Sequence, residues 1–241
     1  MEPGHDEPRR EALLRAVGGA EIPAPGGAAP ASRSGWDAGA AHLLGCGDGV
    51  ISALVRRIGP LDEEDRSRGR PEDPYGALVR TVLGQQLSVR AARSIYGRLC
   101  ARFGGRPPLP GELEAVPDED LRACGVSAAK IRCLRDLARR VLEGSLPLGE
   151  LERLPDREVI LRLTAVRGIG RWSADMFLIF HLRRPDVLPV GDLGIRRAAA
   201  GLYGLSGLPG PEVLHRLAAP WRPWRTTACL YLWRSLDALP A

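Results

Sequence analysis

The chain has 241 residues, of which 34 are lysine or arginine and 29 are aspartate or glutamate, so its net charge is +5, and its mean hydropathy is −0.12. No apolar run approaches the roughly 18 residues of a membrane-spanning helix, and no apolar segment follows a basic one at the N-terminus, which argues against a membrane protein and a secretory signal. We expect a cytoplasmic globular protein, and its mild positive charge favours a polyanionic partner without requiring one.

The five cysteines are scattered along the chain and form no C-x-x-C pair. This pattern predicts neither a zinc site nor a disulfide framework, and it favours reduced and mostly buried thiols. Lys130 is the only lysine, so a mechanism that depends on a lysine amine has a single candidate.

Residues 1–35 contain six glycines and five prolines without sustained periodicity, and we interpret them as a disordered N-terminal extension. Residues 36–241 are interpreted as the folded domain. In it, apolar residues recur at helical spacing between residues 40 and 58, and a polar loop is predicted for 59–74. Helical spacing returns in 75–103, where Gly84-Gln85-Gln86 interrupts the apolar stripe and predicts a polar loop between two helices.

The rest of the chain also shows helical patterns, and Asp156 is expected to cap one of these helices. The predicted helices are Ala128–Leu142, Asp156–Thr164, Trp172–Leu182, Leu193–Leu202, Pro211–Leu217 and Trp224–Leu236. Convincing alternating strands are absent from the sequence, so the predicted fold class is all-α.

Between two of these helices, Gly168 and Gly170 flank one apolar residue. Glycine permits a positive φ and a close approach of another backbone, and the first amides of a helix point outward without intrahelical acceptors. Such a turn forms a cradle for phosphate, beside which Arg171 adds a positive charge. Taken alone the pattern is not specific, because an ordinary C-cap glycine explains it as well.

Asp192 ends the run Leu188-Pro189-Val190-Gly191-Asp192, twenty residues after Trp172. A carboxylate directly before the predicted helix 193–202 is by itself an ordinary N-cap. Its meaning therefore depends on the hairpin that precedes it.

The run Val166–Ala174, followed at this distance by Leu188–Asp192, resembles the helix-hairpin-helix, the glycine/proline-rich loop and the catalytic aspartate of the HhH-GPD superfamily of base-excision DNA glycosylases. The resemblance extends to Leu83–Val89, Cys124–Arg132 and Arg222–Trp233, and so covers about residues 40–236. Within the superfamily, the chain is most similar to the 3-methyladenine DNA glycosylase II branch.

This resemblance implies two helical subdomains with the active-site cleft between them, and a monofunctional enzyme. Bifunctional glycosylase-lyases of the superfamily have a lysine nucleophile where this chain has Trp172, so no Schiff base is expected there, and Lys130 is expected to contact phosphate or to lie on the surface. The four-cysteine iron–sulfur cluster of some relatives is not expected, because only Cys229 follows Asp192. No cofactor is required.

By resemblance, Asp192 is the catalytic carboxylate, which would stabilise the oxocarbenium-like sugar and orient or deprotonate the attacking water. Two other carboxylates are expected to fit worse, since Asp175 is predicted on the exposed side of the second hairpin helix and Asp186 precedes the loop. An alkylated purine is cationic, so aromatic side chains favour its binding. By resemblance, Trp172 and Trp233 occupy positions that line the base pocket, and Met176 stands there where a close relative has tyrosine. Core packing is the alternative for each tryptophan.

Contacts with DNA are expected from the hairpin and from the loop that interrupts segment 75–103. The hairpin residues are Gly168, Gly170, Arg171 and Ser173, and the loop residues are Gln85, Gln86 and Leu87. Relatives insert a wedge into the base stack at the position of Gln86, and simple core packing is the alternative for Leu87. The family hairpin also binds a monovalent cation, Na or K, through main-chain carbonyls, which here would be those of Thr164, Val166 and Ile169.

The expected function is base flipping and hydrolytic excision of alkylated purines, of the 3-methyladenine or 7-methylguanine type, in base excision repair. The alternatives are a glycosylase for deaminated or mismatched bases on the same scaffold, and a non-catalytic helix-hairpin-helix module that only binds DNA. The expected partner is double-stranded DNA with a damaged base, and no membrane. We further expect a monomer that is associated with a bacterial nucleoid.

Overall fold

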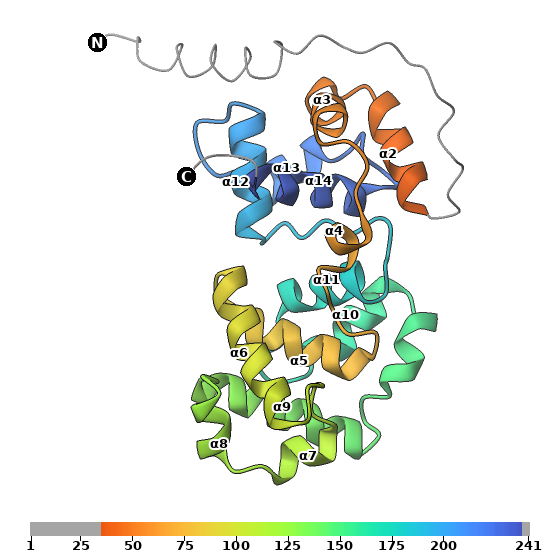
Figure 1. Ribbon diagram of the computed structural model, residues 1–241. Helices are drawn as coiled ribbons and strands as arrows, with labels where there is room; N and C mark the ends of the chain where they lie inside the picture. The colour runs from red at the N-terminus through yellow and green to blue at the C-terminus, as the bar shows by residue number, and fades with distance from the viewer. Residues whose placement is uncertain (1–34, 238–241) are drawn as a thin grey trace. The chain divides into compact units, whose positions relative to one another are not determined.

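The computed structural model describes residues 35–237, and within this range the chain forms helices and no strands, which confirms the all-α prediction (Figure 1). Apart from Gly35, the interpretation of residues 1–35 as an extension concerns a segment outside the described residues and stays a prediction. In the described range, no helix is long and apolar enough to cross a membrane. The described residues form two compact units, one from residues up to Asp65 together with those from Val190 onward, and one from Arg66–Pro189.

The first unit is built around its last helix, which packs against three others. Its helices are α2 (Gly35–Gly45), α3 (Gly49–Ile58), α12 (Leu193–Leu202), α13 (Pro211–Leu217) and α14 (Arg225–Asp237). The carboxylate of Asp48 links several of them, because its Oδ1 caps α3 while its Oδ2 accepts hydrogen bonds from Tyr203 Oη at 2.5 Å and Trp221 Nε1 at 2.9 Å. The short helix α4 (Glu63–Ser67) spans the boundary between the two units.

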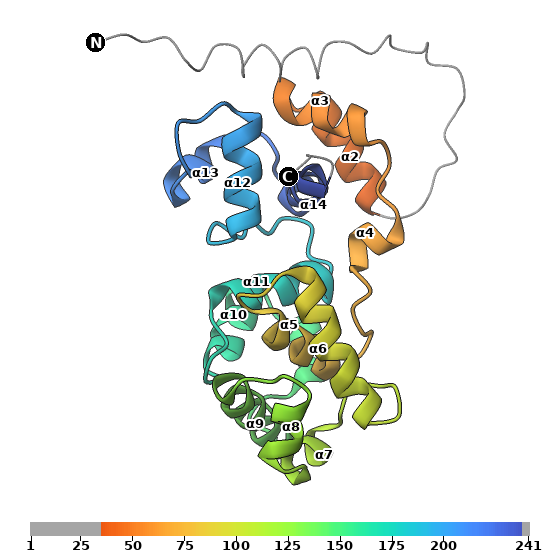
Figure 2. The same cartoon turned by 60° about the vertical axis from the view of Figure 1, so that its left-hand side comes forward.

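The second unit is built around α5 (Pro74–Gly84), whose side chains are almost all buried. Helix α5 contacts α6, α9, α11 and η1, and Figure 2 shows it inside this unit with α6 beside it. The remaining elements are α6 (Val89–Arg102), α7 (Pro110–Ala115), α8 (Asp118–Ala123), α9 (Ala128–Leu142), the 3₁₀ helix η1 (Leu148–Arg153), α10 (Asp156–Thr164) and α11 (Arg171–Phe180).

Long periodic helices were predicted well, and short ones were missed. The bounds of α9, α10, α12 and α13 agree with the prediction, and the break between α5 and α6 is confirmed. The helices α4, α7, α8 and η1 have only five or six residues, too few to show a helical period, so the predicted polar loop 59–74 wrongly omitted α4.

The predicted cap of α10 was also wrong. The N-cap is Pro155, whose carbonyl accepts the amides of Glu158 and Val159, so Asp156 is already in the first turn. Asp156 instead forms an ion pair with Arg184, at 3.2 Å from its Nε. An acidic residue in the first turn still stabilises the helix through its dipole.

Candidate functional site

The hairpin between α10 and α11 is packed on one side and open on the other. Gly168 has a φ of +83°, and a Cβ at this position would lie 3.1 Å from Cβ and 3.3 Å from Sγ of Cys133 on α9. Both predicted reasons for glycine, a positive φ and a close approach, therefore apply to Gly168. At Gly170 neither applies, since its φ of −98° suits any residue and a Cβ would meet nothing within 4 Å.

The N-terminus of α11 has no side-chain cap, so its first-turn amides can donate to an anion. Gly170 is its N-cap, and no side chain caps this end of the helix. The first-turn amides of a helix lack intrahelical acceptors and carry the positive end of the helix dipole. A ten-residue helix that begins in this way can therefore donate hydrogen bonds to a phosphate oxygen.

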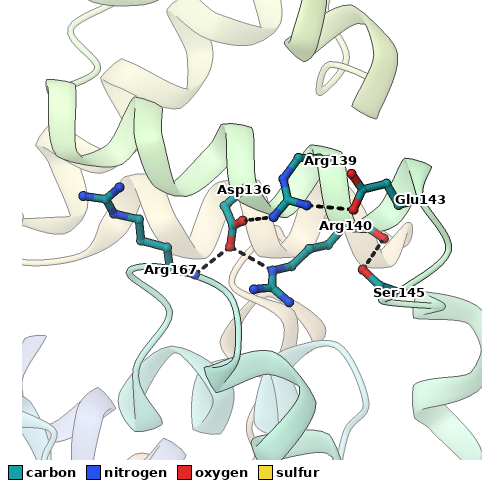
Figure 3. Close-up of polar contacts among 6 residues, drawn as sticks. All are labelled: Asp136, Arg139, Arg140, Glu143, Ser145 and Arg167. Carbon is teal, nitrogen blue, oxygen red and sulfur yellow. Dashed lines mark hydrogen bonds and ion pairs between the residues drawn. The ribbon is translucent and has the colours of Figure 1, made fainter.

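Asp136 on α9 holds the hairpin in place, a role that the sequence did not reveal (Figure 3). Its Oδ2 accepts the main-chain amide of Arg167 at 2.8 Å and Arg140 Nε at 2.9 Å, and its Oδ1 accepts Arg139 Nη2 at 2.6 Å. Burial alone would raise the pKa of this carboxyl, but the amide and the two guanidinium groups lower it to about 2. Asp136 thus fixes the start of the hairpin loop with a charge that persists at every pH of practical interest. The spacing to Arg139 and Arg140 gives helical ion pairs, whereas the bond to Arg167 spans 31 residues and is not predictable from spacing.

Gln85 joins the loop between α5 and α6 to the hairpin. Its Nε2 donates to the carbonyl of Gly168 and to Ser173 Oγ, both at 2.9 Å. Lys130 supports the same loop, because its Nζ donates to the carbonyls of Leu83 at 2.7 Å and Gln85 at 3.0 Å. The expectation that Lys130 contacts phosphate or lies on the surface stays a prediction. Its side chain is half-buried, and its ammonium group satisfies the carbonyls at the end of α5.

The other loop and hairpin residues divide into exposed and buried ones. Gln86, with a φ of +56°, is exposed, and Leu87 is 40% exposed, so the core alternative for Leu87 is wrong. Ser173 is buried, and its hydroxyl accepts the bond from Gln85, which leaves its main chain in the first turn of α11 as the part that could meet DNA.

Asp175 contradicts the prediction that it lies on the exposed side of α11, because it is only 1% exposed. Its Oδ1 accepts a hydrogen bond from Arg171 Nε at 2.8 Å, one helical turn earlier. Burial raises the pKa of Asp175 to about 6, and the ion pair with Arg171 opposes this rise. The guanidinium of Arg171, predicted to bind phosphate, is therefore oriented in part by Asp175, which was predicted to lie on the surface.

Asp192 lies in the first unit, as the N-cap of α12, and it is 8% exposed. Its Oδ1 accepts the main-chain amide of Ile195 at 2.8 Å and Trp233 Nε1 at 2.9 Å. A Cβ on Gly194 would lie 3.0 Å from Asp192 Oδ1 and 3.0 Å from the Trp233 ring, so glycine allows this close packing. Asp192 therefore does cap α12, as the alternative interpretation predicted, and the indole of Trp233 donates a second hydrogen bond to the same carboxylate.

The predicted pocket residues occur in both units. Trp172 is half-buried in the first turn of α11, and Met176 is buried one turn later. Trp233 is buried in the first unit beside Asp192. The structure therefore brings Trp233 and Asp192 into contact, which the sequence did not predict, and it places Trp172 and Met176 at helical spacing on α11.

The predicted cation ligands lie at the end of α10 and in the hairpin. The carbonyl of Val166 accepts the amide of Ile169 at 3.1 Å, while Thr164 Oγ1 donates to the carbonyl of Ile160 at 2.7 Å. In the described part of the chain, no group of three or more His, Cys, Asp or Glu side chains could hold a metal ion. As expected, the cysteines are free thiols, four of them buried and Cys46 half-buried.

Comparisons with known proteins agree on one family. Residues 79–223 match the family described as "HhH-GPD superfamily base excision DNA repair protein". The chain is 40% identical over 196 residues to DNA-3-methyladenine glycosylase 1 of Schizosaccharomyces pombe, which covers 80% of this chain and 85% of the relative.

Two solved structures have a similar fold. The structure of the Schizosaccharomyces pombe 3-methyladenine DNA glycosylase Mag1 in complex with abasic DNA has a TM-score of 0.76 and 36% identity, covering 83% of this chain and 97% of that one. The structure of a DNA-3-methyladenine glycosidase from Bacillus halodurans has a TM-score of 0.68 and 38% identity, covering 81% and 88%.

Proposed function

Since the chain belongs to the HhH-GPD superfamily of base excision DNA repair proteins, we propose that it is a monofunctional DNA glycosylase that excises alkylated purines from duplex DNA by hydrolysis. The names of its relatives, and the abasic DNA bound to one of them, support the substrate class. The observation that carries the proposal is the carboxylate of Asp192, which is nearly buried and held by the amide of Ile195 and the indole of Trp233.

The chemistry follows from the substrate. Alkylation at N3 or N7 makes a purine cationic, so the base departs as a neutral molecule and needs no general acid. The remaining demand is stabilisation of positive charge on the sugar, which a fixed carboxylate in a site that excludes water supplies without reorganisation. Asp192 is assigned this role, together with orientation or deprotonation of the attacking water.

The second unit supplies the binding functions. The open amides at the start of α11 and the exposed Gln86 and Leu87 are assigned to the DNA backbone and to the vacated stack. The electron-rich ring of Trp172 is assigned to the cationic base, a contact worth roughly 0.5–2 kcal/mol. Met176, in place of a second aromatic ring, makes this part of the pocket less selective for charge.

No lyase activity is proposed. The residue after Gly-x-Gly-x is Trp172, which has no amine, and the one lysine of the chain is held by the carbonyls of Leu83 and Gln85. Burial lowers the pKa of Lys130, but both of its bonds lead to main-chain carbonyls and none to a catalytic group.

A monovalent cation at the hairpin fits the donor set that is present. Carbonyl oxygens replace the hydration shell of such ions in proteins, and a carbonyl has two lone pairs, of which that of Val166 uses one for Ile169. We propose that Thr164, Val166 and Ile169 hold Na or K there, which would add positive charge beside the open amides. Replacing K with tetramethylammonium should then lower the Tm of the protein. An unchanged Tm would contradict this assignment.

The proposed partner is double-stranded DNA with a damaged base, bound by a monomer at the nucleoid. Sedimentation of the protein with a lesion-containing duplex tests the monomer, because a complex of one chain per duplex is expected. Two chains per duplex would contradict it.

The decisive experiment measures base release from duplexes that contain 7-methylguanine, 3-methyladenine, hypoxanthine or uracil, with the wild type and Asp192→Asn. Asparagine keeps an Oδ1 that can accept from Ile195 and Trp233, so this variant removes the charge and retains the cap. Release of methylated purines by the wild type, and its loss in the variant, is the expected result. Release of hypoxanthine or uracil alone would identify a glycosylase for deaminated bases. Binding of DNA without release of any base would identify a non-catalytic DNA-binding module.

A further inference from the structure

The positive charge of the chain is concentrated in one part of the second unit. Residues 66–102 contain eight arginines and two acidic residues, a net charge of +6, whereas the whole chain has +5. This segment comprises the end of α4, the loop that follows it, α5 and α6, and the last two helices lie side by side (Figures 1 and 2).

Within this segment, Arg70 and Arg80 join the loop after α4 to helix α5. Arg80 donates hydrogen bonds to the carbonyls of Arg68, at 2.8 Å, and Gly69. Arg70 Nη1 donates to Thr81 Oγ1 at 2.7 Å, and its guanidinium lies 4.5 Å from the centre of the Phe180 ring at the end of α11. Two guanidinium groups are therefore held close together by neutral partners.

In the described residues, neither Arg70 nor Arg80 has a carboxylate partner, and the buried Nε of Arg70 has no hydrogen-bond partner. Asp73, the acidic residue closest to them in sequence along with Glu72, caps α5 through the amide of Gly76. By contrast, Arg102 of the same segment is neutralised by Asp120.

The electrostatic consequence is a pair of positive charges without a carboxylate counterion among the described residues. Burial and the neighbouring charges of Arg80 and Arg68 lower the pKa of Arg70 to about 9. A half-buried positive charge without a counterion is costly, and an anion that binds there recovers that cost. The planar donors of two arginines suit an anion with several acceptor oxygens better than a single carboxylate.

We propose that Arg70 and Arg80 form a binding site for a phosphate group, at the end of α11 opposite the hairpin. The helix has ten residues, so the two sites lie about 15 Å apart along its axis. The phosphate can come from two sources, a phosphodiester of duplex DNA or free inorganic phosphate. The first source rests on the proposed function, and the second does not.

The first arm of the test measures the Tm of the full chain in inorganic phosphate and in chloride of equal ionic strength. Phosphate at ten times its dissociation constant should raise the Tm of the wild type by about 3 °C. Arg70→Gln should lose this rise. The matched control is Arg56→Gln on α3, which removes an exposed arginine of the first unit and should keep it.

The second arm measures the affinity for a lesion-free duplex between 50 and 200 mM salt, and so requires no catalysis. If a DNA phosphate occupies the site, the slope of log Kd against log salt should fall by about 0.9 in Arg70→Gln and in Arg80→Gln. If only free phosphate binds, the slopes stay at the wild-type value and the first arm alone gives the effect. Arg70→Lys keeps the charge but not the planar donors, and it replaces Arg70→Gln if that variant does not fold.

Two results would overturn the proposal. One is a phosphate effect of equal size in the wild type and the Arg70 variants, which would locate the anion elsewhere. The other is no phosphate effect on Tm together with unchanged salt slopes, which would make both arginines purely structural.

Discussion

The hairpin of the second unit and the Asp192 loop of the first unit are held in different ways. The hairpin is fixed by side chains from distant segments, since Asp136 accepts the amide of Arg167 and Gln85 donates to the carbonyl of Gly168. Asp192 is fixed by the first turn of its own helix and by one indole. If the hairpin binds DNA and Asp192 is the catalytic carboxylate, as proposed, single substitutions in the two regions should affect affinity and catalysis separately.

The largest effect beyond Asp192 itself is expected for Trp233→Phe. Phenylalanine retains an aromatic ring but cannot donate to Asp192 Oδ1, so the carboxylate loses the hydrogen bond from the indole. Loss of a hydrogen bond to a charged group costs about 1.5–3 kcal/mol, which predicts a fall in kcat of roughly 10- to 100-fold with little change in DNA affinity.

Trp221→Phe is the matched control for that variant. Trp221 is also buried in the first unit, and its Nε1 donates to Asp48 at 2.9 Å. Both variants should lose stability, measured as Tm, but only Trp233→Phe should lose catalysis. An equal fall in kcat for the two variants would reduce Trp233 to a core residue.

Asp136→Asn is expected to weaken DNA binding with a smaller effect than that of Trp233 on catalysis. The amide cannot accept from Arg167, Arg139 and Arg140 as a carboxylate does, so the start of the hairpin loop loses its fixed position. We expect Kd for duplex DNA to rise about fivefold, or about 1 kcal/mol, while kcat at saturating DNA is unchanged.

Asp118→Asn serves as its control, because Asp118 pairs with Arg135 in the same unit and does not touch the hairpin. Fluorescence anisotropy with a labelled duplex gives the affinities. A fall in kcat without a change in Kd for Asp136→Asn would contradict the assignment of the hairpin to DNA binding.

Gln85→Ala should have a smaller effect on the same measurement. It removes the two bonds to Gly168 and Ser173, whereas the bond between Asp136 and the amide of Arg167 remains. A net contribution of about 0.5–1 kcal/mol predicts a two- to fivefold rise in Kd. Combining it with Asp136→Asn should give a rise that differs from the product of the two, since both act on one loop. Strict additivity would show that the restraints are independent.

The smallest effect is expected for Asp175. Its carboxyl has a raised pKa and changes charge near pH 6, whereas Asp136 stays charged there. Burial raises the pKa of Asp175 from 3.8 to about 6, so folding favours its protonated form. Its contribution to stability is fully present below pH 3.8 and is lost as the pH rises through about 6. The Tm of the wild type relative to Asp175→Asn should therefore fall by a few degrees between pH 4 and 7. A constant difference would contradict the raised pKa.

Much of the local structure was predictable because it depends on short sequence patterns. The helices α9, α10 and α12 have nine or more residues, enough to show a helical period, and α13 has seven. The positive φ of Gly168 follows from the turn between two helices. The all-α class rests on helical spacing along the chain, and the family rests on short runs of which the most informative lies between Val166 and Asp192.

Other features could not be predicted because they depend on contacts between distant segments. The bond from Asp136 to the amide of Arg167, and that from Trp233 to Asp192 across 41 residues, have no signature in spacing. The burial of Asp175 was misjudged because an acidic residue on a helix is usually solvated, and here every residue from 173 to 180 in α11 is buried.

The sequence by itself therefore determined where the longer helices lie, where the hairpin turns and which aspartate precedes α12, because these depend on backbone preferences over a few residues. Only the tertiary structure decided which groups restrain the hairpin and Asp192, and which charges lack a counterion, as Arg70 and Arg80 do. The reason is physical: burial and hydrogen-bond partners are set by segments that meet only when the chain is folded, and these set the charge and orientation of each side chain.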